Sequence, residues 1–369
     1  MKRNKFIISG GGTGGHIFPA LSIANELKRQ YPDADILFVG AEGKMEMERV
    51  PTAGYPIIGL PIRGFNRQRL WKNLSVLIQL VKSLFMARNT LREFKPDAVI
   101  GVGGYASGPV LWMAQRMGIP TIIQEQNSYA GVANKLLAKR AVSICVAYPN
   151  MERFFPKERI VLTGNPVRSE LFTSLPDKGE ALRHFGLSPD KKVILLVGGS
   201  LGARTLNDSV KQHIATIEQA GVQLVWQCGG YYRTEMEKFV AENPSPAIIL
   251  TPFIHRMDYA FSAADLIISR AGAGSVSEFC LIGKPVILVP SPNVAEDHQT
   301  HNALSLVNRQ AAHMVADRDA REKLFPSAIE LLNNDRESAA LGQHILQLGL
   351  PHAATDIVNE IKRALSPKQ

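Results

Sequence analysis

The sequence has few cysteines and no long apolar run, and both absences exclude classes of protein. Its three cysteines, Cys145, Cys228 and Cys280, stand far apart and form no C-x-x-C pair. This pattern argues against a zinc site and a disulfide framework, so we expect three buried thiols. No apolar run approaches the roughly 20 residues of a membrane span, and residues 1–5 lead into a strand without a secretory segment. We therefore expect the protein to stay in the cytoplasm.

Acidic side chains are in deficit, because 33 aspartates and glutamates face 42 lysines and arginines, which gives a net charge of +9. Such an excess suggests an anionic partner: a nucleic acid, a membrane surface or a phosphorylated substrate.

The 369 residues are too many for one ordinary core and enough for two. Apolar strands alternate with helical stretches, which predicts a parallel α/β architecture, and the pattern restarts after a turn-rich passage at residues 163–168. We place a domain boundary there.

A glycine-rich turn near the start of the chain is the most prominent local feature. The apolar run 6–9 is followed by GGGTGGH at residues 10–16 and then by a helix from about Pro19. A turn with so few side chains lets a ligand reach backbone N–H groups at a positive helix end. The run also matches G-x-G-x-x-G, with Glu42 after the next strand, so nicotinamide binding or a turn without a ligand are alternatives. Nicotinamide binding leaves unexplained the position of His16, a titratable group at the mouth of the turn.

Further turns of this kind follow other predicted strands. Glycine-rich runs occupy residues 101–108, 198–202 and 270–274. A strand near the beginning of each half leads into a glycine turn and a helix, which predicts two doubly wound domains. Polar residues 125–127 close another strand, and the carboxyl end of a parallel strand faces the ligand crevice. Asn127 is therefore a candidate contact.

The helix predicted after the last of these turns begins Ser-Val-Ser-Glu. Ser275 and Glu278 have the spacing of a capping box, in which their roles are structural. In the alternative, functional interpretation, the N–H groups of the first turn bind a diphosphate. The carboxylate then accepts two hydrogen bonds from ribose hydroxyls. Both interpretations fit the sequence.

Seven short motifs lie along the chain at residues 11–16, 103–105, 125–127, 164–168, 198–203, 270–278 and 296–299. Their order and residues resemble those of the MurG family, the N-acetylglucosaminyltransferases of peptidoglycan synthesis. The resemblance extends from residue 6 to about residue 360. Seven ordered motifs are far more specific than one glycine loop.

The resemblance implies an α/β protein of the GT-B fold, with two Rossmann-like doubly wound domains facing each other across a cleft. Residues 1–163 would bind the acceptor and the membrane, residues 164–339 would bind the UDP-sugar, and residues 340–369 would form a helical segment that returns to the first domain. The implied reaction moves N-acetylglucosamine from UDP-N-acetylglucosamine to the C4 hydroxyl of undecaprenyl-diphosphate-linked N-acetylmuramoyl pentapeptide. It inverts the sugar's configuration, makes lipid II and needs no cofactor.

Site residues carry over by position. His16 is the leading candidate for the general base, since an imidazole titrates near working pH, although it could instead orient a diphosphate or cap the loop. The remaining substrate contacts implied by the resemblance are Thr13, Gly14, Gly15, Asn127, Arg168, Ser200, Ile254, Ala273, Gly274, Ser275, Val276, Ser277, Glu278 and Gln299. Within this assignment Glu278 holds the ribose, and the backbone of Ile254 holds the uracil.

Two rival functions remain open at this stage. A nicotinamide dehydrogenase has one dinucleotide site, whereas glycine turns occur in both halves of this chain. A glycolipid synthase that acts on diacylglycerol would share the fold and much of the donor site.

No metal site is expected. Asp33 with Asp35, and Asp317 with Asp319, have D-x-D spacing, but the first pair precedes a strand and the second lies in a charged surface run. We therefore expect both pairs to lie in solvated turns. Helix N-termini together with Arg270 are expected to supply the positive potential instead.

The basic charge is concentrated between residues 60 and 100, where eight basic and two acidic side chains give a net +6. The same stretch predicts a helix with an apolar arc of about 220°, roughly twice what one core contact needs. A neighbouring helix, a dimer partner or a lipid surface would cover the excess. We expect an anionic membrane surface rather than nucleic acid, which places the protein peripherally on the cytoplasmic face of the cell membrane. The apolar arc consists of Leu70, Trp71, Leu74, Val76, Leu77, Ile78, Leu80, Val81, Leu84 and Phe85.

Overall fold

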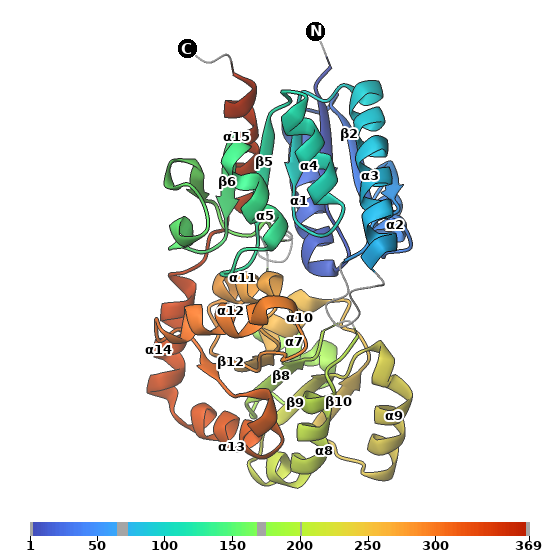
Figure 1. Ribbon diagram of the computed structural model, residues 1–369. Helices are drawn as coiled ribbons and strands as arrows, with labels where there is room; N and C mark the ends of the chain where they lie inside the picture. Colours follow the sequence, from blue (N-terminus) through green and yellow to red (C-terminus); the bar gives the residue numbers. More distant parts are fainter. Residues whose placement is uncertain (1–2, 65–72, 168–174, 200, 367–369) are drawn as a thin grey trace. The chain divides into compact units, whose positions relative to one another are not determined.

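The computed structural model describes residues 3–64, 73–167, 175–199 and 201–366 (Figure 1). The chain forms two compact units, residues 1–167 with 350–369, and residues 168–349. The predicted fold class, an α/β protein with two doubly wound Rossmann-like domains, is confirmed.

The units divide after residues 167 and 349, whereas the bounds that the sequence suggested were 163 and 339. The larger difference concerns α14 (Asp335–Leu346), which belongs to the second unit rather than to a returning C-terminal segment. Its Gly342 lies so close to Gly283 that an added Cβ would stand 2.7 Å from the Gly283 carbonyl oxygen. This contact fixes α14 on the second unit.

The first unit is built around a parallel seven-stranded sheet. Its strand order is β3-β2-β1-β4-β5-β6-β7, in which the order reverses between β1 and β4. Ligands of such sheets bind beyond the carboxyl ends of the strands at this reversal. The strands are β1 (Lys5–Ser9), β2 (Asp35–Ala41), β3 (Ile57–Leu60), β4 (Ala98–Gly101), β5 (Thr121–Glu125), β6 (Ser143–Val146) and β7 (Ile160–Leu162).

Helices cover both faces of this sheet. Alternation along β1 sends Ile7 to one face and Phe6 and Ile8 to the other, so each face buries its own apolar layer. The last helix of the chain packs on the second face, where Ile357 and Ile361 join the layer beside α1. The helices are α1 (Gly14–Gln30), α2 (Glu46–Thr52), α3 (Asn73–Phe94), α4 (Ser107–Arg116), α5 (Val132–Leu137) and α15 (Ala353–Leu365).

The second unit repeats this plan with a six-stranded parallel sheet of order β10-β9-β8-β11-β12-β13. Its central strand β8 is a continuous apolar run buried on both sides, as expected for a parallel strand covered by helices. The strands are β8 (Val193–Val197), β9 (Gln223–Gln227), β10 (Ile248–Thr251), β11 (Leu266–Ser269), β12 (Val286–Leu288) and β13 (His313–Met314). The helices besides α14 are α7 (Lys178–Phe185), α8 (Arg204–Gln219), α9 (Arg233–Glu242), α10 (Met257–Ala263), α11 (Ala273–Ile282), α12 (His298–Val307) and α13 (Ala320–Asn333).

Helix α3 divides the broad apolar arc that the sequence predicted. One side, which includes Val76, is buried against the first unit, whereas four apolar side chains on the other side are exposed. Leu70, Trp71 and the side chain of Leu74 lie outside the described residues. The exposed fractions are Leu77 48%, Ile78 65%, Val81 52% and Phe85 61%. Within the described residues, no helix combines the length and apolar character needed to cross a membrane.

Candidate active site

The loops that follow β1 and β4 meet at the reversal of the first sheet. The Gly11 N–H donates to the Gly103 carbonyl at 3.3 Å. Gly104 has a φ of +85°, and an added Cβ there would lie 2.2 Å from the Gly11 carbonyl oxygen, so only glycine allows this approach. The two glycine motifs that the sequence identified separately are therefore one structure.

Helix α1 begins five residues earlier than expected, at Gly14, with Thr13 as its N-cap. Gly14, Gly15 and His16 consequently form its first turn, the part of a helix where backbone N–H groups lack acceptors one turn earlier and can bind an anion. Pro19 lies in the second turn rather than the first, and its missing N–H leaves the Gly15 carbonyl without the usual helical donor.

The His16 ring is held from two sides. Its Nδ1 lies 3.0 Å from the Thr13 hydroxyl oxygen. On the other side the ring rests against Gly103, where an added Cβ would stand 2.8 Å from Cδ2 and 2.9 Å from Nε2. The orientation of His16 thus depends on a hydroxyl in its own turn and on the absence of a side chain at position 103.

Asn127 is presented by a loop that a buried carboxylate organises. Glu125, at the end of β5, accepts hydrogen bonds from the Asn127 N–H at 3.1 Å, the Gly131 N–H at 2.9 Å and Asn134 Nδ2 at 2.9 Å. Burial raises the pKa of Glu125, and these hydrogen bonds act in the opposite direction. The loop is therefore fixed by polar contacts that the sequence did not reveal.

A network of buried side-chain amides also supports this loop. Gln124 Nε2 donates to Asn165 Oδ1 at 3.0 Å, and Asn165 Nδ2 donates to the Gln126 carbonyl at 3.0 Å. Gln126 in turn donates to the Val102 carbonyl at 2.7 Å. The motif at residues 164–168, predicted as part of the donor site, thus also braces the first unit through Asn165.

In the second unit, residues 273–278 form the first two turns of α11 at the carboxyl end of β11. The N-cap of this helix is Gly272, so Ser275 lies inside the first turn and the capping box does not form. Val276 is 1% exposed, which leaves its backbone as the part able to meet a ligand. Ala273 is buried as well, whereas Gly274, Ser275, Ser277 and Glu278 are half-buried.

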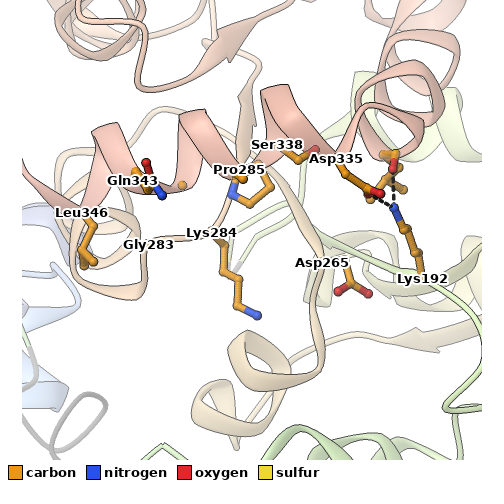
Figure 2. A pocket seen from close by; sticks show the side chains of 12 residues that line it. Lys192, Asp265, Gly283, Lys284, Pro285, Asp335, Ser338, Gln343 and Leu346 are labelled. Atoms are coloured by element: carbon orange, nitrogen blue, oxygen red, sulfur yellow. Dashed lines mark hydrogen bonds and ion pairs between the residues drawn. The ribbon is translucent and has the colours of Figure 1, made fainter.

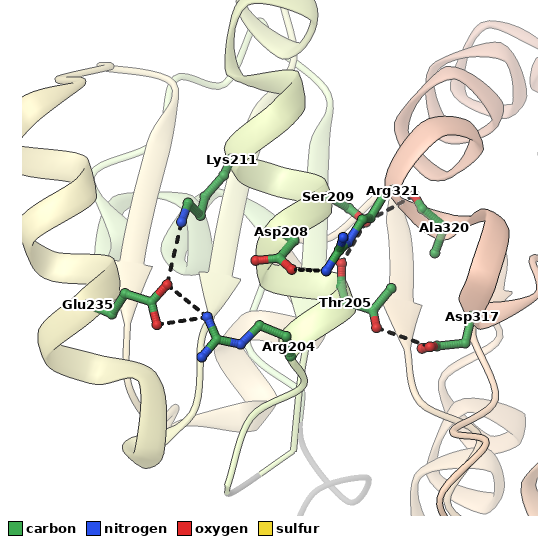
Figure 3. Close-up of polar contacts among 9 residues, drawn as sticks. All are labelled: Arg204, Thr205, Asp208, Ser209, Lys211, Glu235, Asp317, Ala320 and Arg321. Atoms are coloured by element: carbon green, nitrogen blue, oxygen red, sulfur yellow. Dashed lines mark hydrogen bonds and ion pairs between the residues drawn. The ribbon is translucent and has the colours of Figure 1, made fainter.

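Arg270 does not supply a spare positive charge, contrary to our expectation. Its Nη1 donates to the carbonyls of Val289 and Pro290 at 3.0 and 3.2 Å and pairs with Asp317 at 2.5 Å. Asp317 is correspondingly not a solvated turn residue, because its other oxygen accepts the Thr205 hydroxyl at 3.1 Å (Figure 3). This ion pair ties the starts of α8 and α11 together.

Figure 3 also shows the surface pairs beside this contact. Arg204, the first residue of α8, reaches Glu235 at 2.8 Å, and Arg321 reaches Asp208 at 2.5 Å. These pairs connect α8 to α9 and α13.

Gln299 and Ile254 follow β12 and β10 in the second unit. Gln299 Oε1 accepts the Ser291 N–H at 2.8 Å, which orders the loop between β12 and α12. Two consecutive residues of that loop, Glu296 and Asp297, have φ values of 55° and 49°, a strained arrangement typical of ligand-binding loops. The side chain of Ile254 is buried.

The structure also bears on the remaining residues that the sequence singled out. Arg168 and Ser200 fall outside the described residues. Cys145, Cys228 and Cys280 are buried free thiols, as predicted. In the part of the chain that the structure describes, no three His, Cys, Asp or Glu side chains gather as metal ligands.

A cavity of about 490 Å³ lies at the amino ends of strands in the second sheet (Figure 2). Its lining includes Lys192, Asp265 and Pro285, the residues just before β8, β11 and β12. Its two carboxylates are already paired, Asp335 with Lys192 at 2.6 Å and Asp265 with Lys178 at 2.5 Å. The glycine turns follow β8 and β11 at the other ends of these strands, so the candidate active site is not here.

Two parallel sheets that each carry a glycine turn at the reversal of strand order define an α/β protein of the nucleotide-binding class. Residues 6–146 match the model of the glycosyltransferase family 28 N-terminal domain, and residues 193–356 match that of its C-terminal domain. The chain belongs to glycosyltransferase family 28, and the family resemblance seen in the motifs is confirmed.

Two curated relatives that match almost the whole chain carry the same name. A protein of Parabacteroides distasonis called UDP-N-acetylglucosamine--N-acetylmuramyl-(pentapeptide) pyrophosphoryl-undecaprenol N-acetylglucosamine transferase is 57% identical over 100% of both chains. Its namesake from Phocaeicola vulgatus is 59% identical over 97% of this chain and 95% of its own. The crystal structure of Acinetobacter baumannii MurG has a TM-score of 0.78 and 30% identity, covering 98% of this chain and 99% of that one.

Proposed function

We propose that this chain transfers N-acetylglucosamine from UDP-N-acetylglucosamine to the C4 hydroxyl of undecaprenyl-diphosphate-linked N-acetylmuramoyl pentapeptide, with inversion. The product is lipid II, the disaccharide precursor of peptidoglycan. The observation that carries the proposal is 57% identity, over the whole of both chains, to a transferase named for this reaction.

The second unit binds the donor in this proposal. The first turn of α11 offers backbone N–H groups and a positive helix end to the diphosphate, while Glu278 accepts the ribose hydroxyls. Arg270 acts indirectly, by holding the β11–α11 turn against β12 through the Val289 carbonyl and Asp317. Gln299 contacts the sugar, and the Ile254 backbone contacts the uracil.

The first unit binds the acceptor. The attacking hydroxyl loses its proton as it bonds to the anomeric carbon, UDP leaves with the bonding electrons, and His16 takes the proton. The ring is suited to this role because Thr13 and Gly103 fix its plane. Positioning of the acceptor diphosphate is the alternative role for His16.

The first unit also docks on the cytoplasmic face of the cell membrane, where a lipid-linked acceptor resides. Helix α3 supports this assignment because its exposed apolar side is accompanied by exposed basic residues, among them Lys82 and Arg92. Apolar residues ringed by lysine and arginine are suited to an anionic lipid surface. Helix α4 also places a basic group beside an exposed apolar one. The Arg116 guanidinium carbon lies 4.3 Å from the centre of the partly exposed Trp112 ring.

Transfer assays with two acceptors test the proposed reaction. Radiolabelled UDP-N-acetylglucosamine is incubated with the purified chain and either the lipid-linked N-acetylmuramoyl pentapeptide or diacylglycerol. We expect label in the first acceptor alone, and label in diacylglycerol alone would establish the glycolipid synthase instead. Calorimetry with UDP and with NAD checks the donor class, since a dehydrogenase would bind NAD.

A further inference from the structure

Glu46 is a buried carboxylate that reaches out of its own helix. It is the first residue of α2 and its side chain is 1% exposed. Oε2 accepts the Gly12 N–H at 2.8 Å, and Oε1 accepts the Ala41 N–H at 3.0 Å. Glu46 therefore joins the glycine loop after β1 to the end of β2, using both oxygens.

Two glycines make room for this side chain. An added Cβ at Gly11 would stand 2.2 Å from Glu46 Oε1, and one at Gly40 would stand 2.6 Å from Glu46 Cγ. Gly11 and Gly12 have φ values of +144° and +90°. The conformation of the loop and the presence of the carboxylate behind it thus depend on one another.

The Gly12 contact changes what the loop can offer to an anion. A buried carboxylate is costly unless it accepts hydrogen bonds, and bonds from N–H to a charged acceptor are about twice as strong as neutral ones. The Gly12 N–H is therefore committed to Glu46, and the Gly11 N–H to the Gly103 carbonyl. The His16 N–H also bonds within its own turn, to the Thr13 carbonyl at 3.1 Å, so the amides of α1 that can meet a substrate anion include those of Gly14 and Gly15.

We propose that Glu46 is a positioning residue, which locks the loop at Gly12 so that α1 starts at Gly14 and aims its first turn and His16 at the acceptor. The inference rests on the proposed function, since it assigns this loop to the acceptor side of the transfer. Glu46 touches no substrate and acts through the Gly12 amide.

Glu46→Gln is the sharpest test, because it keeps the shape of the side chain but turns an NH2 group toward a backbone N–H. A displacement of about 1 Å in a reacting group lowers rates by about 100-fold, so we expect a loss of that size in kcat/KM for the acceptor. UDP affinity measured by calorimetry should stay unchanged, since the donor site belongs to the second unit. Hydrogen exchange at the Gly12 and Ala41 amides should become faster.

Two further variants complete the experiment. Glu48→Gln, an exposed carboxylate on the same helix, should retain wild-type kinetics and exchange. Gly40→Ala displaces Glu46 through its Cγ while keeping the carboxylate, and should reproduce the loss if Glu46→Gln fails to fold.

The outcomes separate this inference from the proposed function. Wild-type transfer by Glu46→Gln, or a loss of transfer without faster exchange at Gly12, would overturn the positioning role. A fall in activity that matches only the fraction of unfolded protein, with acceptor KM unchanged, would also overturn it. If the wild-type chain binds UDP but does not glycosylate the lipid-linked acceptor, the proposed function fails, and exchange at Gly12 still decides whether Glu46 holds the loop.

Discussion

Thr355, in the last helix of the chain, donates its hydroxyl to the Glu26 carboxylate on α1 at 3.0 Å. The two residues are 329 positions apart. The pKa of Glu26 is lowered from 4.5 to about 2, chiefly by the hydrogen bond from Arg29, with further bonds from Gln30 and Thr355. The contact between the first and last helices of this unit therefore includes an ionised carboxylate.

This contact should make the stability of the first unit depend on acid pH. Because the folded-state pKa is the lower one, the stabilisation is present above about 4.5 and is lost as the pH falls toward about 2. Glu26→Gln should lower the free energy of unfolding at neutral pH and flatten its decline over that range. Urea unfolding at several pH values measures this, and the exposed Glu48→Gln should follow the wild type throughout. A Glu26→Gln curve parallel to wild type would contradict the prediction.

His16→Ala should lower kcat by about 100-fold or more while UDP affinity stays nearly unchanged, if the imidazole is the base. A change confined to KM would indicate binding instead.

Gly103→Ala tests the orientation of that ring without removing it. Its Cβ would stand 2.8 Å from His16 Cδ2 at a φ of +90°, so the ring must move and kcat should fall as in His16→Ala. Gly108→Ala is the matched control, because an added Cβ there meets nothing within 4 Å. Full activity in Gly103→Ala would show that the ring's position does not limit the rate.

Glu278→Gln should raise the donor KM by weakening charge-assisted hydrogen bonds to the ribose. The change should not remove a helix cap, since the N-cap of α11 is Gly272 and the capping box is absent. Steady-state kinetics and thermal unfolding measure the two effects. Glu322→Gln, an exposed glutamate in the first turn of α13, is the control. Unchanged donor kinetics in Glu278→Gln would contradict the proposal that Glu278 binds the ribose.

Chelators should leave UDP binding intact, because helix N-termini can stabilise the diphosphate without a metal ion. Calorimetry with and without a chelator measures this. Asp317→Asn should nonetheless weaken UDP binding, since it breaks the 2.5 Å pair with Arg270 that holds the β11–α11 turn. If the chelator abolished UDP binding to the wild-type chain, the prediction that no metal ion is needed would be wrong.

Replacing Ile78 and Phe85 by serine should reduce binding to vesicles that contain anionic lipid, without altering UDP affinity. Both side chains are more than 60% exposed, so their removal should cost little stability. High salt should weaken binding as well. Leu175→Ser, a 41% exposed leucine of the second unit, is the control. Unaltered vesicle binding with a lower melting temperature would assign these residues to the core.

The sequence was sufficient for the architecture because six of the seven motifs stand where a parallel strand ends, a position that periodicity and glycine reveal. It was insufficient for the long-range contacts. Nothing in the pattern around Glu46 indicates that it reaches Gly12, 34 positions away. Asp317 was judged a surface residue because its neighbours are charged, whereas β13 places it beside Arg270. Helix α1 was predicted to begin too late because glycine disfavours helices, yet Gly14 and Gly15 lie in the first turn.

The placement of α15 has a consequence for synthesis. The second unit is one continuous segment, residues 168–349, whereas the first is completed only by residues 350–369. A ribosome thus finishes the sheet of the second unit while the face formed by Phe6, Ile8 and Ile100 still lacks Ile357 and Ile361. Apolar surface left open during translation is a substrate for chaperones and a route to aggregation. The part of the chain made first is therefore the last to mature, and premature termination near residue 349 would leave an intact second unit attached to an unfinished first one.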